Sequence, residues 1–406
     1  MNDSRDHVSD STTENMASSA ASTSSSAGAL ALSSSITSLP SISTPLNDTV
    51  MGTLHPVKLF SLSSSSSLPT AASPQVPYTS VSHNPQGSFF ITTSPNGSLQ
   101  LFDSLRARSF KTTYSKKYGC SNAIFTLRTA THSVPTSCVI ASTIPASSDD
   151  AANNALRFLD LNTNSFIRYF QAHTKQVTST VSSPSSAFGL DAFYSASADG
   201  TVRAWDSRSD KCYACLANMG DSPIIALDRS GTILAIWHQN KSTVYLVPLE
   251  SFPIGIIGKI EVANCPSERI EKIVWADKGL LILDPPGHDK IVIDTIKLGV
   301  AGTLSGVTPF AISSQSDDAA RSGSVDVTPD GCWCLSGSGD GSTLAWNLSA
   351  FFGTGGRIPP VHPIRIANDE LISKQIVPRI LTINPKLGSV VTGDTEIVIS
   401  IFNKDE

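Results

Sequence analysis

Two carboxylates flank a tryptophan in the stretch SASADGTVRAWDSR, which spans residues 195–208. Asp199 and Asp206 lie seven positions apart, and Asp206 directly follows Trp205. A pair of carboxylates can carry general acid–base catalysis when their environments give them different protonation states. Carboxylates are equally common as acceptors for the backbone N–H groups of tight turns. The element that carries Asp199 and Asp206 therefore decides which role they have.

Cysteines offer a second candidate chemistry. Cys212 and Cys215 form a C-x-x-C motif, a spacing that zinc sites and redox centres use. The surrounding segment KCYACLA is predicted to be a strand, and a spacing of three places two side chains on opposite faces of a strand. Cys332 and Cys334 share a predicted face but have no second pair to complete a site. We therefore expect the seven cysteines to be reduced, as in a reducing compartment.

Other motifs for catalysis or cofactor binding are not found. The glycine-rich stretches 337–341 and 353–356 lack the Lys-Ser/Thr of a phosphate-binding loop. The eight histidines show neither an i, i+4 pair nor clustered ligand spacing. The segment PPGHDK, residues 285–290, lies between two apolar strands and is predicted to be a surface hairpin. The sequence predicts no catalytic, cofactor-binding or metal-binding residue, and no enzyme activity.

Composition limits the remaining function classes. The chain has 406 residues, of which 40% are hydrophobic and 16% charged, and its formal net charge is -5. An acidic chain of this kind is not expected to bind nucleic acid directly, and no apolar run is long enough to span a membrane. Residues 1–50 contain 21 Ser or Thr and no aromatic residue, too little apolar surface to offset chain entropy. We predict a disordered Ser/Thr-rich tail over residues 1–55.

Three stretches share one pattern of strand, two-residue turn and strand. They are ITTSPNGSLQLFD (91–103), YSASADGTVRAWD (194–206) and LSGSGDGSTLAWN (335–347). Asn-Gly and Asp-Gly are strong hairpin signals because both turn positions need positive φ. Asp199 is thus predicted to lie in a hairpin turn, and Asp206 to accept hydrogen bonds at the end of the following strand.

The spacing of these hairpins predicts the architecture. The turns at Asn96 and Asp199 are 103 residues apart, and those at Asp199 and Asp340 are 141 apart. With roughly 40–45 residues per four-stranded blade plus insertions, these intervals equal two and three blades. We predict an all-β fold, a seven-bladed β-propeller over residues 76–406. The final strand, TEIVISIF, would leave an exposed edge, and residues 56–60 are predicted to pair with it and close the ring.

This pattern resembles the WD-repeat family. In that family a histidine, a Ser or Thr, the turn aspartate and the strand tryptophan form a buried hydrogen-bonded set. The matching residues here are His173, Ser197, Asp199 and Trp205. The resemblance implies a structural role for Asp199, since such a set fixes the turn of a blade.

Two further stretches carry a narrower resemblance. The stretches similar to segments of a known protein group are TTYSKKYG (112–119) and RFLDLNTNSFIRYFQAHTKQV (157–177). That group is the WD-repeat propeller subunits of COMPASS-type complexes, which methylate histone H3 on lysine four. The resemblance extends to GSGDGSTLAWN (337–347) and INPK (383–386). The same subunits belong to the cleavage and polyadenylation factor and, in animals, to a nuclear phosphatase complex. The resemblance implies a non-catalytic scaffold in the nucleus. Its partners would be a SET-domain methyltransferase, other COMPASS subunits, the phosphorylated RNA polymerase II tail and polyadenylation factor subunits.

Basic residues are unevenly placed. Residues 104–148 contain six Lys or Arg and no Asp or Glu, although the whole chain is acidic. Such a sector attracts acidic or phosphorylated partners. We expect a partner surface bordered by Lys116, Lys117, Arg168 and Lys175, with Tyr114, Tyr118 and Tyr169 available for stacking.

Three alternatives remain open at this stage. One is a role in 3′-end processing, termination or a phosphatase complex rather than in histone methylation. Another is a propeller enzyme that uses its central channel, although the sequence shows no converging ionisable residues for it. The last is a cytoplasmic WD-repeat adaptor.

Overall fold

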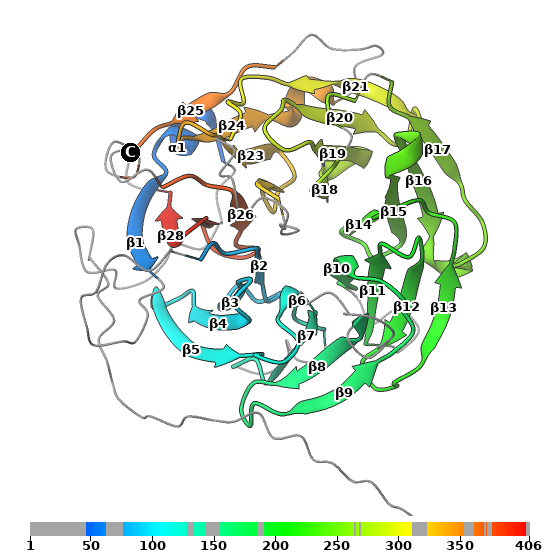
Figure 1. Ribbon diagram of the computed structural model, residues 1–406. Coiled ribbons are helices and arrows are strands. Elements are labelled where there is room, and N and C mark those ends of the chain that lie inside the picture. Colours follow the sequence, from blue (N-terminus) through cyan, green and yellow to red (C-terminus); the bar gives the residue numbers. More distant parts are fainter. Residues whose placement is uncertain are drawn as a thin grey trace, which may run out of the picture.

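The strands form seven sheets of four strands each, arranged around one central axis (Figure 1). The computed structural model describes residues 46–61, 76–127, 134–142, 154–184, 191–263, 265–267, 269–310, 323–352, 361–368, 371 and 376–402. Its architecture confirms the prediction of an all-β, seven-bladed propeller. The turns at Asn96, Asp199 and Asp340 lie in blades one, three and six, separated by two and three blades as the spacing predicts.

Within a blade, the chain runs from the innermost strand to the outermost, and neighbouring strands are antiparallel. Blade one contains β2 (Ser80–His83), β3 (Phe89–Thr93), β4 (Ser98–Asp103) and β5 (Arg108–Tyr114). Blade two contains β6 (Ser121–Ile124), β7 (Ser137–Ala141), β8 (Leu156–Asp160) and β9 (Phe166–Phe170). Blade three contains β10 (Val177–Ser182), β11 (Ala192–Ser197), β12 (Val202–Asp206) and β13 (Cys212–Leu216). Blade four contains β14 (Ile224–Leu227), β15 (Ile233–His238), β16 (Thr243–Pro248) and β17 (Gly258–Glu261).

The remaining blades follow the same order, except at the end of the chain. Blade five contains β18 (Lys272–Trp275), β19 (Leu280–Asp284), β20 (Lys290–Asp294) and β21 (Gly299–Leu304). Blade six contains β22 (Val325–Val327), β23 (Trp333–Gly337), β24 (Thr343–Asn347) and β25 (Ile364–Ile366). Blade seven contains β26 (Ile380–Ile383), β27 (Ser389–Gly393) and β28 (Glu396–Ile401), with β1 (His55–Ser61) as its outer strand. The short helices are α1 (Asp48–Gly52), η4 (Gln239–Lys241), η5 (Leu249–Ser251), η6 (Asp277–Gly279) and η7 (Leu348–Phe351).

Blade seven joins the two ends of the described chain. β1 pairs antiparallel with β28, with Leu59 opposite Val398. Because β1 lies near the start of the chain and β28 near its end, this pairing closes the ring of blades (Figure 1).

The segment just before β1 differs from the expected tail. Residues 1–45 lie outside the described residues, but residues 46–55 are described and include helix α1. Met51 and Leu54 are buried against blades six and seven, and the indole Nε1 of Trp333 donates to the carbonyl of Leu46 at 3.1 Å. The prediction of disorder through residue 55 is therefore wrong for its last ten residues, because a few apolar side chains there find a place in the core.

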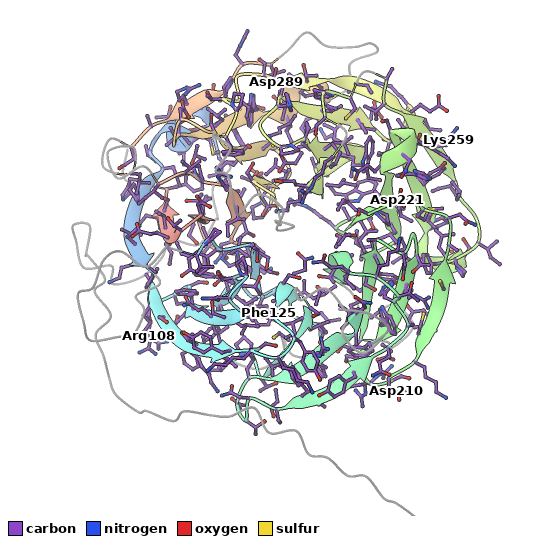
Figure 2. All side chains as sticks on the ribbon, in the orientation of Figure 1. Arg108, Phe125, Asp210, Asp221, Lys259 and Asp289 are labelled. Atoms are coloured by element: carbon purple, nitrogen blue, oxygen red, sulfur yellow. The ribbon has the colours of Figure 1, made fainter. Side chains whose placement is uncertain are left out.

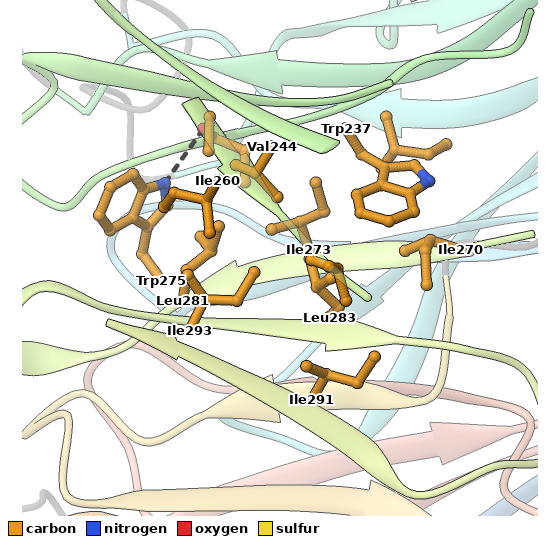
Figure 3. Close-up of a cluster of buried hydrophobic side chains, with 14 of the residues drawn as sticks. Trp237, Val244, Ile260, Ile270, Ile273, Trp275, Leu281, Leu283, Ile291 and Ile293 are labelled. Carbon is orange, nitrogen blue, oxygen red and sulfur yellow. Dashed lines mark hydrogen bonds between the residues drawn. The ribbon is translucent and has the colours of Figure 1, made fainter. Parts of the chain in front are cut away.

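Buried apolar clusters occupy each junction between adjacent blades. Figure 3 shows the junction of blades four and five, where Trp237, Trp275 and several aliphatic side chains interdigitate. The indole of Trp275 donates to the Ala226 carbonyl at 3.1 Å, so its one polar atom is paired inside this cluster. The core is thus a ring of interblade layers rather than one central mass.

The two ends of the propeller carry different connections. Loops that join consecutive blades contact the hairpin turns between the second and third strands, as when Ser115 N donates to Gly97 O at 2.7 Å and Met219 N to Gly200 O at 2.9 Å. We call this end the loop face. The turns from the first to the second strand and from the third to the fourth strand lie at the opposite end, the turn face. In the described part of the chain, no helix is long and apolar enough to cross a membrane.

Candidate functional site

The turn carboxylate Asp199 lies in a buried hydrogen-bonded chain on the loop face of blade three. His173 Nδ1 is 3.0 Å from Asp199 Oδ2, and His173 Nε2 is 2.7 Å from Ser195 Oγ. The indole Nε1 of Trp205 donates to the same Ser195 hydroxyl at 2.8 Å. This order, Asp to His to Ser, is the order of a catalytic triad. Ser195 is fully buried beneath Trp205, however, so no substrate can reach its hydroxyl.

The hydroxyl in this set is Ser195 and not the predicted Ser197. Ser197 Oγ instead donates to the Lys175 carbonyl at 2.9 Å and accepts from the Asp199 N–H at 3.2 Å. The register explains the difference, because Phe193 is paired directly with Trp205. Ser195 is the diagonal neighbour of that indole on the same face, whereas Ser197 lies two residues further towards the turn.

The environment of Asp199 keeps its carboxylate ionised. Burial by itself would raise the pKa of this group. Hydrogen bonds from His173, from the Thr201 hydroxyl at 2.6 Å and from the Thr174 N–H at 2.9 Å outweigh burial and hold the pKa of Asp199 well below its usual value. An acceptor of this kind fixes the hairpin turn and the preceding loop in one arrangement, which is a structural role.

The Asp206 side chain also stabilises a turn. Its carboxylate accepts the Arg208 N–H at 3.0 Å and forms an ion pair with the Arg208 guanidinium at 2.6 Å. The side-chain hydrogen bond from the Arg208 guanidinium is the main reason why the pKa of Asp206 is lowered. The two carboxylates of the opening stretch therefore hold opposite ends of one strand, β12, and do not converge on a shared reaction centre.

The sulfur atoms do not form a centre within the described residues either. Cys212 and Cys215 both lie on β13, and all seven cysteines, which fall in the described ranges, are free thiols. No group of three His, Cys, Asp or Glu side chains in that part of the chain is arranged to hold a metal ion.

The predicted basic residues Lys116 and Lys117 project from a tight turn on the loop face of blade one. The turn follows β5, and Gly119 N donates to Ser115 O at 2.8 Å to close it. Gly97 of the neighbouring hairpin has a φ of +78°, and a Cβ there would lie 2.6 Å from the Ser115 carbonyl oxygen. Only glycine permits this close approach, so the hairpin of blade one fixes the position of both exposed lysines.

A buried arginine organises the aromatic residues beside this turn. The guanidinium of Arg157, on β8, lies 3.7 Å from the ring centre of Tyr118 and 5.8 Å from that of Tyr169. Phe166 completes the cluster, with its ring 5.6 Å from Tyr169 and 6.0 Å from the guanidinium. Cation–π contacts of this kind strengthen when they are shielded from water. The structure thus brings Tyr118 and Tyr169 to one guanidinium, and their role in stacking against a partner stays a prediction.

Arg157 itself was not among the predicted residues. The available signal was its place in the strand LRFLD, where an arginine between apolar residues must find partners once it is buried. Sequence spacing alone does not show that these partners are aromatic rings from blade one and from the adjacent strand β9.

The other predicted partner residues are more dispersed. Tyr114 is exposed at the end of β5, and Lys175 is exposed on the loop between blades two and three. Arg168, on β9, turns away from the Tyr118 cluster and donates a hydrogen bond to the Ser207 carbonyl of blade three. Arg168 therefore links two blades, and the candidate surface is reduced to the six other predicted residues: Tyr114, Lys116, Lys117, Tyr118, Tyr169 and Lys175.

The central channel holds charged residues that connect the blades. The inner strands enclose a cavity of about 340 Å³, lined in part by Arg229, Lys272 and Asp326. Asp326 accepts the Ile383 N–H at 2.8 Å, Lys272 donates to the Leu381 carbonyl at 3.2 Å, and Arg229 donates to backbone carbonyls of blade six. Each of these side chains reaches a neighbouring or next-neighbouring blade, so their contacts stabilise the ring.

Comparison with known proteins identifies a matching family model and several relatives of this chain. A family model described as "WD domain, G-beta repeat" matches residues 164–206, the segment that contains His173, Asp199 and Trp205. COMPASS component SWD2 of Saccharomyces cerevisiae is 26% identical over 337 residues, which cover 81% of this chain and 92% of that protein.

Two further relatives extend the comparison. Protein ANTHESIS POMOTING FACTOR 1 of Arabidopsis thaliana is 30% identical over 263 residues, covering 64% of this chain and 71% of that protein. Set1 complex component swd2 of Schizosaccharomyces pombe is 32% identical over 212 residues, covering 52% of this chain and 54% of that protein. These matches confirm the predicted resemblance, and the chain belongs to the family of WD-repeat propellers that includes these three proteins.

Proposed function

We propose that this protein is a non-catalytic subunit of a nuclear histone H3 lysine-four methyltransferase complex of the COMPASS, or Set1, type. In this role the propeller is a scaffold that holds the SET-domain methyltransferase and links it to transcribing RNA polymerase II. Catalysis belongs to the methyltransferase, and the carboxylates of the propeller hold its turns. The observation that carries the proposal is the match to COMPASS component SWD2, which extends over 92% of that protein.

The charge of blade one supports a partner of opposite sign. The described residues 76–127 contain five Lys or Arg and a single carboxylate, Asp103, in a chain whose formal net charge is -5. The side chain of Asp103 is only 1% exposed, so the surface of this blade is positive. Lys116 and Lys117 on the rigid turn then meet an acidic region of the methyltransferase or the phosphorylated tail of the polymerase. Tyr118 and Tyr169 provide a flat surface beside them.

Affinity purification with mass spectrometry tests this function directly. The tagged full-length protein is expected to capture a SET-domain methyltransferase and other COMPASS subunits from nuclear extract. The double variant Lys116→Glu/Lys117→Glu should capture less, and the deficit should be larger at low salt because exposed charges are screened at high salt. Lys241→Glu, an exposed lysine on the loop face of blade four, is the matched control and should capture normally.

The composition of the captured complex decides between neighbouring roles. Polyadenylation factor or phosphatase subunits without a methyltransferase would replace the proposed function with one in 3′-end processing or termination. Equal capture by the wild-type protein and the Lys116/Lys117 variant at low salt would remove the basic turn from the partner surface.

A further inference from the structure

A second charged feature lies at the opposite end of β5, on the turn face of blade one. The buried carboxylate of Asp103 accepts the Arg106 N–H at 3.1 Å and pairs with the guanidiniums of Arg106 at 2.9 Å and Arg108 at 3.5 Å. The two arginine side chains are 66% and 57% exposed. One carboxylate therefore fixes two guanidiniums on a short turn and neutralises only one of their two charges. We call Leu105, Arg106, Arg108 and Phe110 the arginine turn.

Apolar side chains flank the two guanidiniums. Leu105 is 46% exposed, and Phe110 is 43% exposed while its ring packs edge-on against Phe89 at 5.4 Å. Ala107, between the arginines, is buried and has a φ of 44°. The turn thus presents cationic and apolar groups on fixed supports, and Figure 2 shows Arg108 at the outer rim of the propeller.

Blade one supplies no exposed carboxylate near these guanidiniums among its described residues. Asp103 is the single Asp or Glu within the described residues 76–127. The next carboxylate among the described residues, Asp160 of blade two, accepts the N–H groups of Asn162 at 2.7 Å and Thr163 at 3.3 Å in its own turn. Lys111 lies beside that turn and donates to the Asn162 carbonyl at 3.1 Å, which adds another cation to the rim. The local field is therefore positive.

We propose that the arginine turn docks an acidic segment of a partner protein, in which Asp or Glu side chains alternate with large apolar ones. The partner carboxylate lies across the Arg106 and Arg108 guanidiniums, whose planar N–H groups match a carboxylate in a two-pronged contact. An apolar neighbour of that carboxylate covers Leu105 and Phe110. Charge complementarity identifies this occupant, because the one carboxylate already present leaves a net positive charge.

This docking surface is separate from the surface described under the proposed function. The Lys116–Lys117 turn follows the last residue of β5, whereas the arginine turn precedes and includes its first residues, at the other end of the strand. An acidic segment bound at the arginine turn leaves the loop face open for a second partner. Docking at the arginine turn does not depend on membership in a methyltransferase complex.

Fluorescence anisotropy with the full-length protein tests the proposal. The probe is a labelled peptide of about twelve residues in which Asp and Glu alternate with Leu and Phe, and its control has Asn and Gln in place of the acids. We expect the acidic peptide to bind and the neutral one not to bind. Arg108→Gln should weaken binding by about fivefold, the range expected for one exposed ionic contact. Arg108→Lys keeps the charge but loses the planar contact, so its affinity for the acidic peptide should lie between those of the wild-type protein and Arg108→Gln.

A matched control is present on the same face of the molecule. Arg208 occupies the equivalent turn of blade three, is 45% exposed and pairs with Asp206. This turn holds one arginine and a second carboxylate, Asp210, and Arg168 of blade two donates to its Ser207 carbonyl, so its charge differs from that of the arginine turn. Arg208→Gln should leave peptide affinity unchanged. The melting temperature of each variant is measured first, so that loss of folding is not mistaken for loss of binding.

Three results would overturn the inference. The acidic and neutral peptides could bind equally, or Arg208→Gln could weaken binding as much as Arg108→Gln does. A phosphoserine peptide without Asp or Glu, or a single-stranded RNA, could bind more tightly than the acidic peptide and show the same dependence on Arg108. The last result would assign the turn to a phosphate ligand.

Discussion

The hydroxyl of Ser195 is shared by two buried groups, and their chemistry fixes the direction of each hydrogen bond. The indole N–H of Trp205 can only donate, so Ser195 Oγ accepts from it. In the neutral tautomer that donates from Nδ1 to the ionised Asp199, His173 Nε2 accepts the serine proton. The result is one continuous chain from the turn carboxylate to the tryptophan, in which every donor has an acceptor.

Removal of Ser195 tests this chain. Ser195→Ala leaves the Trp205 N–H and His173 Nε2 without their partner inside the core, and we expect a loss of about 1–3 kcal/mol in unfolding free energy. Ser197→Ala should cost less, because the backbone groups that Ser197 serves lie nearer to water at the turn. Urea denaturation of the two variants measures both values. A larger loss for Ser197→Ala would contradict the assignment of the shared hydroxyl.

The same residues show where sequence reasoning reaches its limit. Ser195 and Ser197 lie on one face of one strand, so alternation cannot separate them. Only the pairing of Phe193 with Trp205 identifies Ser195 as the diagonal neighbour of the indole. Asp199 was predictable because its Asp-Gly turn has a local signature, whereas the nearest aromatic partner of Arg157, Tyr118, lies in a turn of another blade.

A partly buried histidine on β2, His83, predicts a pH dependence of stability. His83 Nδ1 is 3.4 Å from the Thr382 hydroxyl, its Nε2 has no hydrogen-bond partner among the described residues, and burial lowers the pKa of His83 to about 3. The fold thus favours the neutral ring. Stability is complete above the ordinary pKa of 6.5 and declines as the pH falls towards 3, because the unfolded chain takes up the proton first. The slope is up to about 1.4 kcal/mol per pH unit.

His83→Gln keeps a side chain able to bond Thr382 but cannot be protonated. Its melting temperature should therefore fall less steeply than that of the wild-type protein between pH 6.5 and pH 4.5. His238→Gln is the control at the second histidine, whose pKa is lowered by burial and by Lys241. Its effect should be smaller because a backbone hydrogen bond and Asp221 oppose the lowering of this pKa. An unchanged pH profile for His83→Gln would show that protonation of His83 does not limit stability.

At the scale of elements, the hairpins of the propeller differ in what holds them. Blade three uses the charged set around Asp199, whereas blade five uses a buried ion pair between Lys290 and Asp284 at 2.6 Å. The second oxygen of Asp284 accepts the Ser324 N–H at 2.9 Å and so connects blade five to blade six. PPGHDK does form a turn with an exposed His288, as predicted, but its final lysine lies inside the protein.

The ion pair of blade five predicts an asymmetry between single and double substitutions. Lys290→Met leaves the Asp284 carboxylate buried without its counter-charge, and we expect a loss of about 3–5 kcal/mol. Lys290→Met combined with Asp284→Leu should recover much of that loss, although Ser324 N–H then lacks an acceptor and about 1–3 kcal/mol remains missing. Urea denaturation of the single and double variants gives the coupling energy. A loss in the double variant equal to the sum of the losses in Lys290→Met and in Asp284→Leu alone would mean that the pair contributes nothing beyond its separate parts.

Local signals predicted the hairpins, but not the interactions that stabilise each one. Asn-Gly and Asp-Gly dipeptides mark the turns because they satisfy a backbone requirement that is internal to the turn. The partner of a buried charge depends on which strand lies opposite and on which blade is adjacent. Lys290 and Asp284 are six residues apart and meet across a hairpin, yet their burial depends on blade six, which follows later in the chain.

At the scale of the whole molecule, stability depends on closing the ring. Each blade buries its faces against two neighbours, so an unclosed end would expose one interblade layer and the free edge of β28. β1 prevents this, and α1 anchors β1 through buried Met51 and the hydrogen bond from Trp333 to the Leu46 carbonyl. The sequence predicted the closing strand from the missing partner of the last strand. It did not predict the helical anchor, because few apolar residues precede β1.

A variant that begins at residue 62 lacks both α1 and β1. Burial of Met51, Leu54, Val57 and Leu59 is lost, at about 1.5–3 kcal/mol for each side chain, which together is comparable with the whole stability of a domain. The exposed edge of β28 is then expected to pair between molecules, so light scattering should show dimers or larger species. A control that begins at Leu46 keeps both elements and should remain monomeric. Addition of a peptide of residues 46–61 should restore the monomer by supplying the missing strand. If the truncated variant is instead monomeric without the peptide and has an unchanged melting temperature, the ring closes without β1.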